Sequence, residues 1–234
     1  MKIIGHRGAR GTELENSLAS IQAALALDLD AIEFDIHRTR DDQLVVMHDA
    51  TTKRTAGEDV RIADVTLDEL RHVRLQNEQA IPTLEEVLQL AGDHALYIDI
   101  KDEGTVPLLL QLLKQYPAPQ ITVVSRLVHE LTAVRAERPD IPAYLYFLKA
   151  EHPLPRPIHM VHVARRAGIT GLALDKLIIN PITYRLAVRS GLRMYCYPIQ
   201  SLRGARLLHF LYPRVDIMAS RPEKINRTTF AKYL

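Results

Sequence analysis

Short β-branched runs alternate with amphipathic helical patterns from one end of the chain to the other, and this alternation limits the folds open to it. Eight strands are expected, at residues 2–6, 31–37, 95–101, 120–125, 142–147, 169–175, 192–197 and 214–219. Strands separated by helices pair in parallel, and eight such units in 234 residues favour a closed barrel over an open doubly wound sheet. No strand is followed by a glycine-rich phosphate-binding turn, which weakens the open alternative further. We predict an α/β fold, a (β/α)8 TIM barrel with a short insertion after strand 2, formed by residues 1–234 as a single domain.

The helical patterns carry recognisable start signals. Thr83 and Glu86 form a predicted capping box in front of an apolar stripe with i, i+3, i+4, i+7 spacing. Asn16 or Ser17 is expected to cap an earlier helix. Residues 43–82 break the alternation, and there we expect a short strand and then an excursion that precedes the next helix.

The composition indicates a globular protein, with 47% apolar and 25% charged residues. The formal net charge is +2 and no run of five like charges occurs, which argues against nucleic-acid binding. Cys196 is the single cysteine, so an intramolecular disulfide is excluded and a reducing compartment is favoured. No signal-peptide-length or bilayer-spanning apolar run is present, so we predict a cytoplasmic location without stable membrane insertion.

Ionisable residues gather at the ends of several predicted strands, where a barrel places its catalytic groups. His6 lies at the end of the first strand, and a short strand leads to His48. Glu33 and Asp35 share one face of the second strand, and Asp99 lies in the third. Charges on the inner face of a barrel are costly unless paired or metal-bound, so three carboxylates and two histidines together suggest a divalent cation beside an acid–base pair.

Positive charge is expected at the same rim. Arg7 and Lys101 adjoin these residues and suit a bound phosphate. Each feature also has a structural explanation, since a strand-end histidine is often structural and the carboxylates could simply pair with Arg7 or Lys101. Accidental ionisable pairs at four separate strand ends are a weaker explanation than one shared site.

These residues form a pattern that resembles the glycerophosphodiester phosphodiesterase family, whose motifs run HRG, ENT, E-x-D, T-x-D-G and V-x-HD. The matching segments here are Gly5-His6-Arg7-Gly8, Glu15-Asn16-Ser17, Glu33-Phe34-Asp35, Thr39-Arg40-Asp41 and Val45-Val46-Met47-His48-Asp49. Arg54-Thr55, Ile81-Pro82-Thr83-Leu84 and Ile98-Asp99-Ile100-Lys101 are similar to later family segments. The resemblance is strong over residues 3–102 and weaker but collinear beyond.

The resemblance implies metal-dependent hydrolysis of small glycerophosphodiesters to sn-glycerol 3-phosphate and an alcohol on a TIM barrel. By its motifs, His6 and His48 look like the acid–base pair, and Arg7 and Lys101 like the phosphate clamp. The implied metal ligands are Glu33, Asp35 and Asp99, with Glu15 beside the metal. Asn16 is instead expected to cap the following helix. Which histidine is the acid stays open, as does attack by water against attack by the glycerol hydroxyl with a cyclic phosphate intermediate.

Several positions depart from the family pattern. Asp99 replaces the usual glutamate, and the shorter carboxylate tilts our expectation towards Mg²⁺ rather than Ca²⁺. Arg126, Met194–Pro198 and Ala219–Pro222 also differ from the usual motifs. We expect Tyr195 or Tyr197 to line the alcohol side of the site and several small head groups to be accepted.

Two other functions stay open. One is a phosphodiesterase that resembles lysophospholipase D or sphingomyelinase D, although the sequence shows no amphipathic membrane-binding segment. The other is a non-catalytic barrel that binds phosphorylated ligands, which would not need two histidines. The sequence does not indicate the oligomeric state.

Overall fold

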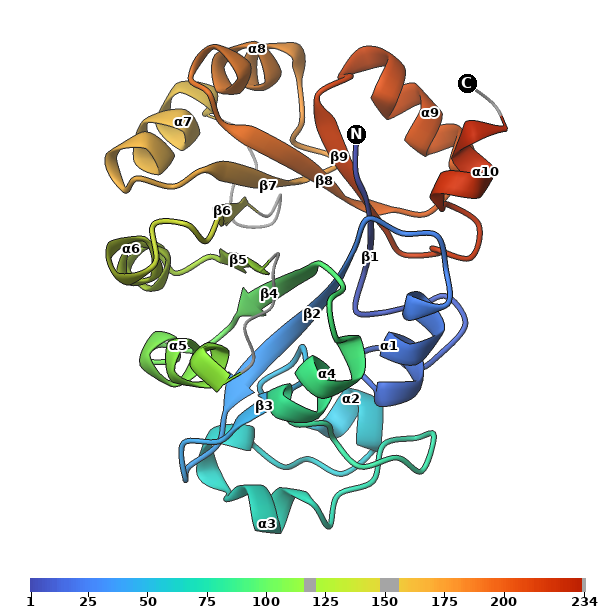
Figure 1. Cartoon of the computed structure of the whole chain (residues 1–234), viewed down its shortest axis with the longest axis vertical. Helices are drawn as coiled ribbons and strands as arrows, with labels where there is room; N and C mark the ends of the chain where they lie inside the picture. Colours follow the sequence, from blue (N-terminus) through green and yellow to red (C-terminus); the bar gives the residue numbers. More distant parts are fainter. Residues whose placement is uncertain (116–120, 148–155, 233–234) are drawn as a thin grey trace.

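A computed structural model describes residues 1–115, 121–147 and 156–232 (Figure 1). Nine strands of this part of the chain form one sheet. They are β1 (Ile3–Gly5), β2 (Ala31–Arg38), β3 (Leu44–Val46), β4 (Leu96–Ile100), β5 (Ile121–Ser125), β6 (Ala143–Phe147), β7 (Gly171–Asp175), β8 (Arg193–Ile199) and β9 (Val215–Ala219). Each of the eight predicted strand ranges overlaps one of them, and β3 is the predicted short strand.

Parallel pairing closes the sheet into a barrel. β1 pairs with β2 on one side, with Ile4 opposite Ala31, and with β9 on the other, with Ile3 opposite Ile217. The remaining barrel strands pair in parallel with their neighbours in chain order. The predicted (β/α)8 barrel is therefore confirmed, whereas the single-domain organisation of residues 1–234 stays a prediction.

Helices follow the barrel strands and cover the outside of the sheet (Figure 1). They are α1 (Leu18–Leu25), α4 (Leu84–Ala91), α5 (Val106–Gln115), α6 (Val128–Glu137), α7 (Pro157–Arg166), α8 (Pro181–Arg189), α9 (Leu202–Leu211) and α10 (Arg227–Ala231). Thr83 and Glu86 form the predicted capping box of α4. The cap of α1 is Ser17, whose side chain accepts the Ser20 N–H. Across the described ranges, no helix combines the length and the apolar character needed to cross a bilayer.

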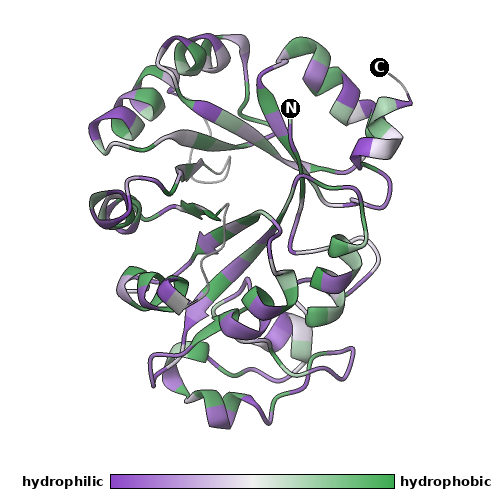
Figure 2. Ribbon diagram, in the orientation of Figure 1, coloured by the Kyte–Doolittle hydropathy of each residue, from purple (hydrophilic) through white to green (hydrophobic). Residues whose placement is uncertain are grey.

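Apolar side chains fill two separate layers. The larger lies between strands and helices, and the smaller fills the inside of the barrel. Tyr97, Tyr144 and Tyr195 meet in the smaller layer, with ring centroids 5.6–6.0 Å apart. Figure 2 shows hydrophilic segments interrupting the apolar strands β2 and β4, which carry the predicted carboxylates.

The predicted insertion after the second strand is a small unit with an apolar cluster of its own. It contains β3, α2 (Lys53–Ala56), the 3₁₀ helix η1 (Ile62–Asp64) and α3 (Leu67–Leu70). Val45, Ile62 and Leu70 pack in its cluster. β3 runs antiparallel to β2, with Val46 opposite Ile36. This pairing holds β3 against the last residues of β2, and His48 follows β3 two residues later.

Candidate active site

Three carboxylates converge inside the barrel. Glu33 and Asp35 project from the same face of β2, because side chains two residues apart share a face. Parallel pairing sets Asp99 of β4 directly opposite Asp35. All three side chains are buried, and one oxygen of each lies within 4.8 Å of the others. The sequence prediction that these residues meet is confirmed by the geometry.

Two cationic side chains contact this cluster. Lys101 Nζ lies 2.7 Å from Asp35 Oδ1 and 2.6 Å from Asp99 Oδ2. The Arg7 backbone N–H donates to Glu33 Oε2 at 2.8 Å, and Arg7 Nε lies 3.3 Å from Asp35 Oδ2. Burial alone would raise the pKa of Asp35, but Lys101 and Arg7 outweigh it and hold that pKa well below its usual range.

The cluster contains more carboxylate charge than these cations neutralise. Burial and the neighbouring Asp35 raise the pKa of Glu33 well above its usual value. Burial also raises the pKa of Asp99, although Lys101 opposes the shift. Like charges crowded in a buried site favour protonation unless a further cation is bound, and oxygen-only ligands suit a hard divalent cation. The triad fits such an ion, and the contacts of Lys101 with two of its members fit the ion-pair explanation as well.

His48 lies just beyond β3 on a short anchored turn. The Met47 N–H donates to the Asp35 carbonyl at 3.1 Å, which holds this turn against β2. His48 Nδ1 lies 2.6 Å from Asp49 Oδ1, and Arg54 Nε in turn lies 2.6 Å from Asp49 Oδ2. Because the Asp49 carboxylate only accepts, Nδ1 of His48 carries a proton, and Nε2 of the neutral ring has the free lone pair.

His6 follows β1, and its Nδ1 accepts a hydrogen bond, whereas the Nδ1 of His48 donates one. Its Nδ1 lies 3.1 Å from the Ser220 hydroxyl and 3.4 Å from Arg10 Nη1. Arg10 can only donate, so Nδ1 of the neutral ring accepts and the proton lies on Nε2. Burial lowers the pKa of His6 well below its usual value, and the nearby charges of Arg7 and Arg10 lower it further.

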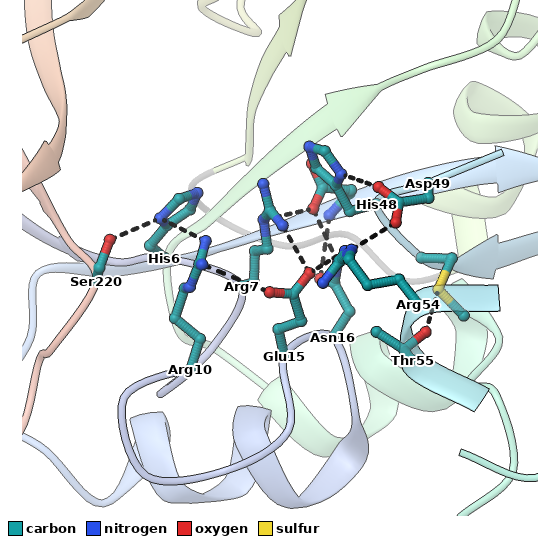
Figure 3. A network of polar contacts seen from close by, with 12 residues as sticks. His6, Arg7, Arg10, Glu15, Asn16, His48, Asp49, Arg54, Thr55 and Ser220 are labelled. Atoms are coloured by element: carbon teal, nitrogen blue, oxygen red, sulfur yellow. Dashed lines mark hydrogen bonds and ion pairs between the residues drawn. The ribbon is translucent and has the colours of Figure 1, made fainter. Parts of the chain in front are cut away.

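An ion-pair network lies between the two histidines (Figure 3). Glu15 Oε1 lies 2.6 Å from both Arg7 Nη1 and Arg54 Nη2, and Glu15 Oε2 lies 3.6 Å from Arg10 Nη2. Glu15 therefore holds three guanidinium groups at the site. It lies outside the carboxylate triad formed by the described residues, and its contribution to a metal site stays a prediction.

Asn16 has a role that its sequence motif did not indicate. Its φ is 59°, a left-handed conformation that asparagine tolerates, and its side-chain N–H donates to Asp35 Oδ2 at 2.8 Å. The expectation that Asn16 caps the next helix is wrong, because Ser17 is the cap. The positive φ turns the Asn16 side chain into the barrel, where it orients a carboxylate of the triad.

His37, two residues beyond Asp35 on β2, connects the two sides of the site. It is buried, with Nδ1 2.9 Å from Asp102 Oδ2 and Nε2 3.1 Å from the His48 carbonyl oxygen. Both partners are acceptors, so only the imidazolium form of His37 donates to both. Its position in phase with Glu33 and Asp35 was visible in the sequence, but its contacts depend on segments far apart along the chain.

We expect His37→Leu to lower kcat by about 10-fold to 10²-fold with little change in KM, because the His48 turn loses its hydrogen bond to β2. Steady-state kinetics on a small phosphodiester would measure this. His72→Leu is the matched control, since His72 is exposed in the insertion. A His37→Leu kcat within twofold of the parent value would show that the turn is held without this bond.

The two proposed catalytic histidines and the cationic side chains near them line a pocket of about 570 Å³. One wall includes His6, Arg7, His48 and Lys101. The other consists of Arg126, just after β5, and of Tyr146, Asp175, Tyr197 and Pro198 from β6, β7 and β8. Tyr146 and Tyr197 stack with centroids 4.5 Å apart. Tyr197 lines the pocket, and its place on the alcohol side of the substrate stays a prediction. Tyr195 lies two residues deeper on the same face of β8 and is buried in the barrel layer.

The family model described as "Glycerophosphoryl diester phosphodiesterase family" matches residues 6–200. A lysophospholipase D of Rattus norvegicus is 34% identical over 155 residues, which are 59% of this chain and 49% of the relative. A glycerophosphodiester phosphodiesterase of Caldanaerobacter subterraneus is 31% identical over 142 residues, 54% of this chain and 58% of the relative. The chain spans about half the length of the curated relatives it matches.

Solved structures share the fold. An Oleispira antarctica phosphodiesterase in complex with the product sn-glycerol-3-phosphate superposes with a TM-score of 0.87 at 23% identity, over 96% of this chain and 95% of that one. A glycerophosphodiester phosphodiesterase from Agrobacterium tumefaciens gives a TM-score of 0.79 at 19% identity, over 99% of both chains. The likeness extends over nearly the whole barrel.

Proposed function

Because the family model matches residues 6–200, the chain belongs to the glycerophosphoryl diester phosphodiesterase family, and we propose that it hydrolyses glycerophosphodiesters to sn-glycerol 3-phosphate and an alcohol. The observation that carries the proposal is the pair of histidines on one pocket, with opposite proton placement, beside a buried carboxylate triad. A phosphodiester needs a base, an acid and a cationic environment, and this pocket supplies each.

In this proposal, Arg7 and Lys101 hold the phosphate. Both line the pocket, and both are fixed by carboxylates, so their positive charges are set in place before the substrate arrives. Burial would lower the pKa of Lys101, but Asp35 and Asp99 raise it instead, so its ammonium stays charged. Preorganised charge of this kind stabilises the charge that develops in the transition state and is typically worth a few kcal/mol, about 2.7–4 for one lost donor in another hydrolase.

His48 is the proposed base and His6 the proposed acid. With Asp49 on its Nδ1, the neutral His48 ring offers the Nε2 lone pair to the attacking hydroxyl. His6 is the acid in its imidazolium form, which gives the Nε2 proton to the departing alkoxide. The negative charge of a bound phosphodiester favours that form against the lowered pKa of the free site. As the new P–O bond forms, the bond from phosphorus to the head-group oxygen breaks, and each histidine moves one proton.

A divalent cation is the proposed cofactor, held by Glu33, Asp35 and Asp99. When bound, it supplies positive charge to the phosphate oxygens and acidity to a bound hydroxyl. The short Asp99 side chain favours Mg²⁺, which keeps several waters, slightly over Ca²⁺, which takes more protein oxygens. A cytoplasmic location remains a prediction.

One relative supports a second candidate substrate. The rat protein, 34% identical over 155 residues, is named a lysophospholipase D, an enzyme class that acts on a phosphodiester with an acyl chain. The stacked Tyr146 and Tyr197 form an apolar wall that could pack against a head group or a lipid glycerol. A non-catalytic phospho-ligand-binding barrel is disfavoured, because simple binding has no use for two histidines with opposite proton placement.

We expect the purified chain with Mg²⁺ to release glycerol 3-phosphate from glycerophosphocholine, glycerophosphoethanolamine and glycerophosphoglycerol, with rates that differ by less than about 10³-fold. The reason is that the stacked Tyr146 and Tyr197 offer an apolar wall that suits several small head groups. A coupled assay for glycerol 3-phosphate measures the reaction, and lysophosphatidylcholine is the comparison substrate. Cleavage of lysophosphatidylcholine alone would assign the second candidate. Tight binding of glycerophosphocholine without turnover would indicate the non-catalytic function.

A further inference from the structure

Positive charge is concentrated in one part of the chain, although the total is nearly balanced. Residues 156–214 contain ten Lys and Arg but one acidic residue, Asp175, whereas the whole chain has 30 Lys and Arg and 28 Asp and Glu. All ten of these cationic side chains are exposed. The segment comprises α7, β7, α8, β8 and α9, so this side of the barrel is strongly cationic. Arg156, Lys176, Arg185 and Arg203 lie towards the end where these helices begin, and the cations in the last turns of α7 and α8 lie towards the opposite end.

Three large aliphatic side chains are exposed on the same side. Ile158, Leu177 and Ile182 are 76%, 61% and 63% exposed, and we call them the apolar rim. α7 and α8 both begin with the dipeptide Pro-Ile, so Ile158 and Ile182 hold equivalent positions in two helices that pack together. Leu177 lies in the connection from β7 to α8. Because helices of a parallel barrel begin where the preceding strands end, the rim lies at the end that bears the pocket.

Hydrogen bonds attach the rim to the wall of the pocket. Asp175 lines the pocket, and its Oδ1 accepts the Leu177 N–H at 2.7 Å. The Lys176 N–H donates to the carbonyl of Tyr197, also on the pocket wall, at 2.7 Å. The exposed Leu177 is therefore held in place beside the substrate entrance.

Cationic side chains flank the rim without carboxylate partners. Arg156 precedes α7, Lys176 precedes Leu177, and Arg185 lies one turn after Ile182. Among the residues that the structure describes, none of these three forms an ion pair. A groove of about 420 Å³ runs from Ile158 along α7 and α8 to Arg165 and Arg166 in the last turn of α7, away from the pocket end.

We propose that this end of the barrel docks on the surface of an anionic phospholipid membrane. Such a surface offers negative head groups above hydrocarbon, which match cations that surround exposed aliphatic side chains. Nucleic acid would satisfy the cations but not the aliphatic side chains, since bases stack on aromatic rings or guanidinium planes. A second copy related by a two-fold axis would bring like charges together.

Docking in this way turns the mouth of the pocket towards the lipid. The rim residues are separate from the catalytic groups, so the surface binds lipid whether or not the pocket hydrolyses phosphodiesters. The contact is peripheral, as it involves single exposed side chains rather than an inserted helix.

The test is sedimentation of the full chain with extruded vesicles, in the absence of substrate. We expect binding to phosphatidylcholine vesicles that contain phosphatidylglycerol, weakening with added salt, and no binding to phosphatidylcholine alone. Leu177→Ser with Ile182→Ser should weaken binding at least about tenfold, since the apolar contribution scales with the area buried.

The matched control is Leu207→Ser with Phe210→Ser, two side chains on α9 that are 60% and 83% exposed. The control should bind as the parent does.

Fluorescence gives a second readout because the chain contains no tryptophan. Ile182→Trp should shift its emission to the blue on anionic vesicles, whereas Phe210→Trp should not. The proposal would be overturned if the parent failed to bind vesicles or if both double variants lost binding equally. A fall in solution mass in the rim variant alone would also overturn it, by showing that a second copy covers the rim. Unchanged hydrolysis of a soluble glycerophosphodiester by the rim variant would show that its pocket is intact.

Discussion

His48→Ala should lower kcat by at least about 10²-fold while the fold stays intact, because the ring supplies the proposed base and positioned proton transfer contributes about 10²–10⁴-fold. His48 is half-buried just beyond a short strand, with 32% of its side chain exposed, so its ring makes no large packing contribution and circular dichroism and thermal unfolding should match the parent. His129→Ala is the matched control, since that histidine is exposed on α6. A near-normal kcat for His48→Ala would remove the residue from the mechanism.

The pH dependence gives a second check on the same residue. Burial lowers the pKa of His48, with Lys101 and Arg7 adding to the effect and Asp35 and Asp49 opposing it. A base with a lowered pKa stays unprotonated, and therefore active, to a lower pH than an ordinary histidine. The acidic limb of kcat/KM should then lie below about 6.5, the usual histidine value, and a bound divalent cation would move it in the same direction.

Asp49→Asn should give an intermediate loss. The amide could donate to Nδ1 of His48 and favour the tautomer with its proton on Nε2, which cannot act as a base. The loss should therefore appear in kcat more than in KM. His48→Ala with Asp49→Asn should be no slower than His48→Ala alone, since Asp49 acts through His48.

The barrel was predictable because its signals are local. β-branched runs, helix stripes and the Thr83 capping box each lie within a few residues, and the order of the strands follows from parallel pairing in chain order. The catalytic candidates were predictable for a related reason, since a barrel brings the ends of its strands together. Glu33, Asp35 and Asp99 meet as expected.

What the sequence could not indicate depends on contacts through space. His37 needs Asp102 and the turn at His48, and Tyr146 reaches the pocket by stacking on Tyr197. The three residues of the apolar rim lie in three separate segments, so no single amphipathic stretch of the sequence predicts it. The cationic segment at residues 156–214 could have been found by counting charge along the chain, because the balanced total concealed an uneven distribution.

Asp99→Asn should weaken divalent-cation binding at least about 10²-fold, because it removes one of three anionic ligands from a buried site. Isothermal titration with Mg²⁺ and Ca²⁺ measures the loss, and chelation of the parent should stop hydrolysis. Asp175→Asn is the matched control, since Asp175 lines the pocket outside the triad.

Asp99→Glu separates a metal ligand from a partner of Lys101. Asp99 Oδ2 lies 2.6 Å from Lys101 Nζ, so an ion pair alone would also explain its presence. A glutamate is longer by one carbon–carbon bond, about 1.5 Å, and can still bind the cation after a small shift of the ion. We therefore expect Asp99→Glu to keep substantial activity and to bind Ca²⁺ better relative to Mg²⁺, since Ca²⁺ accepts bidentate carboxylates. If Asp99→Asn binds the cation as tightly as the parent, Asp99 serves Lys101 alone, and Glu33 and Asp35 must hold the ion without it.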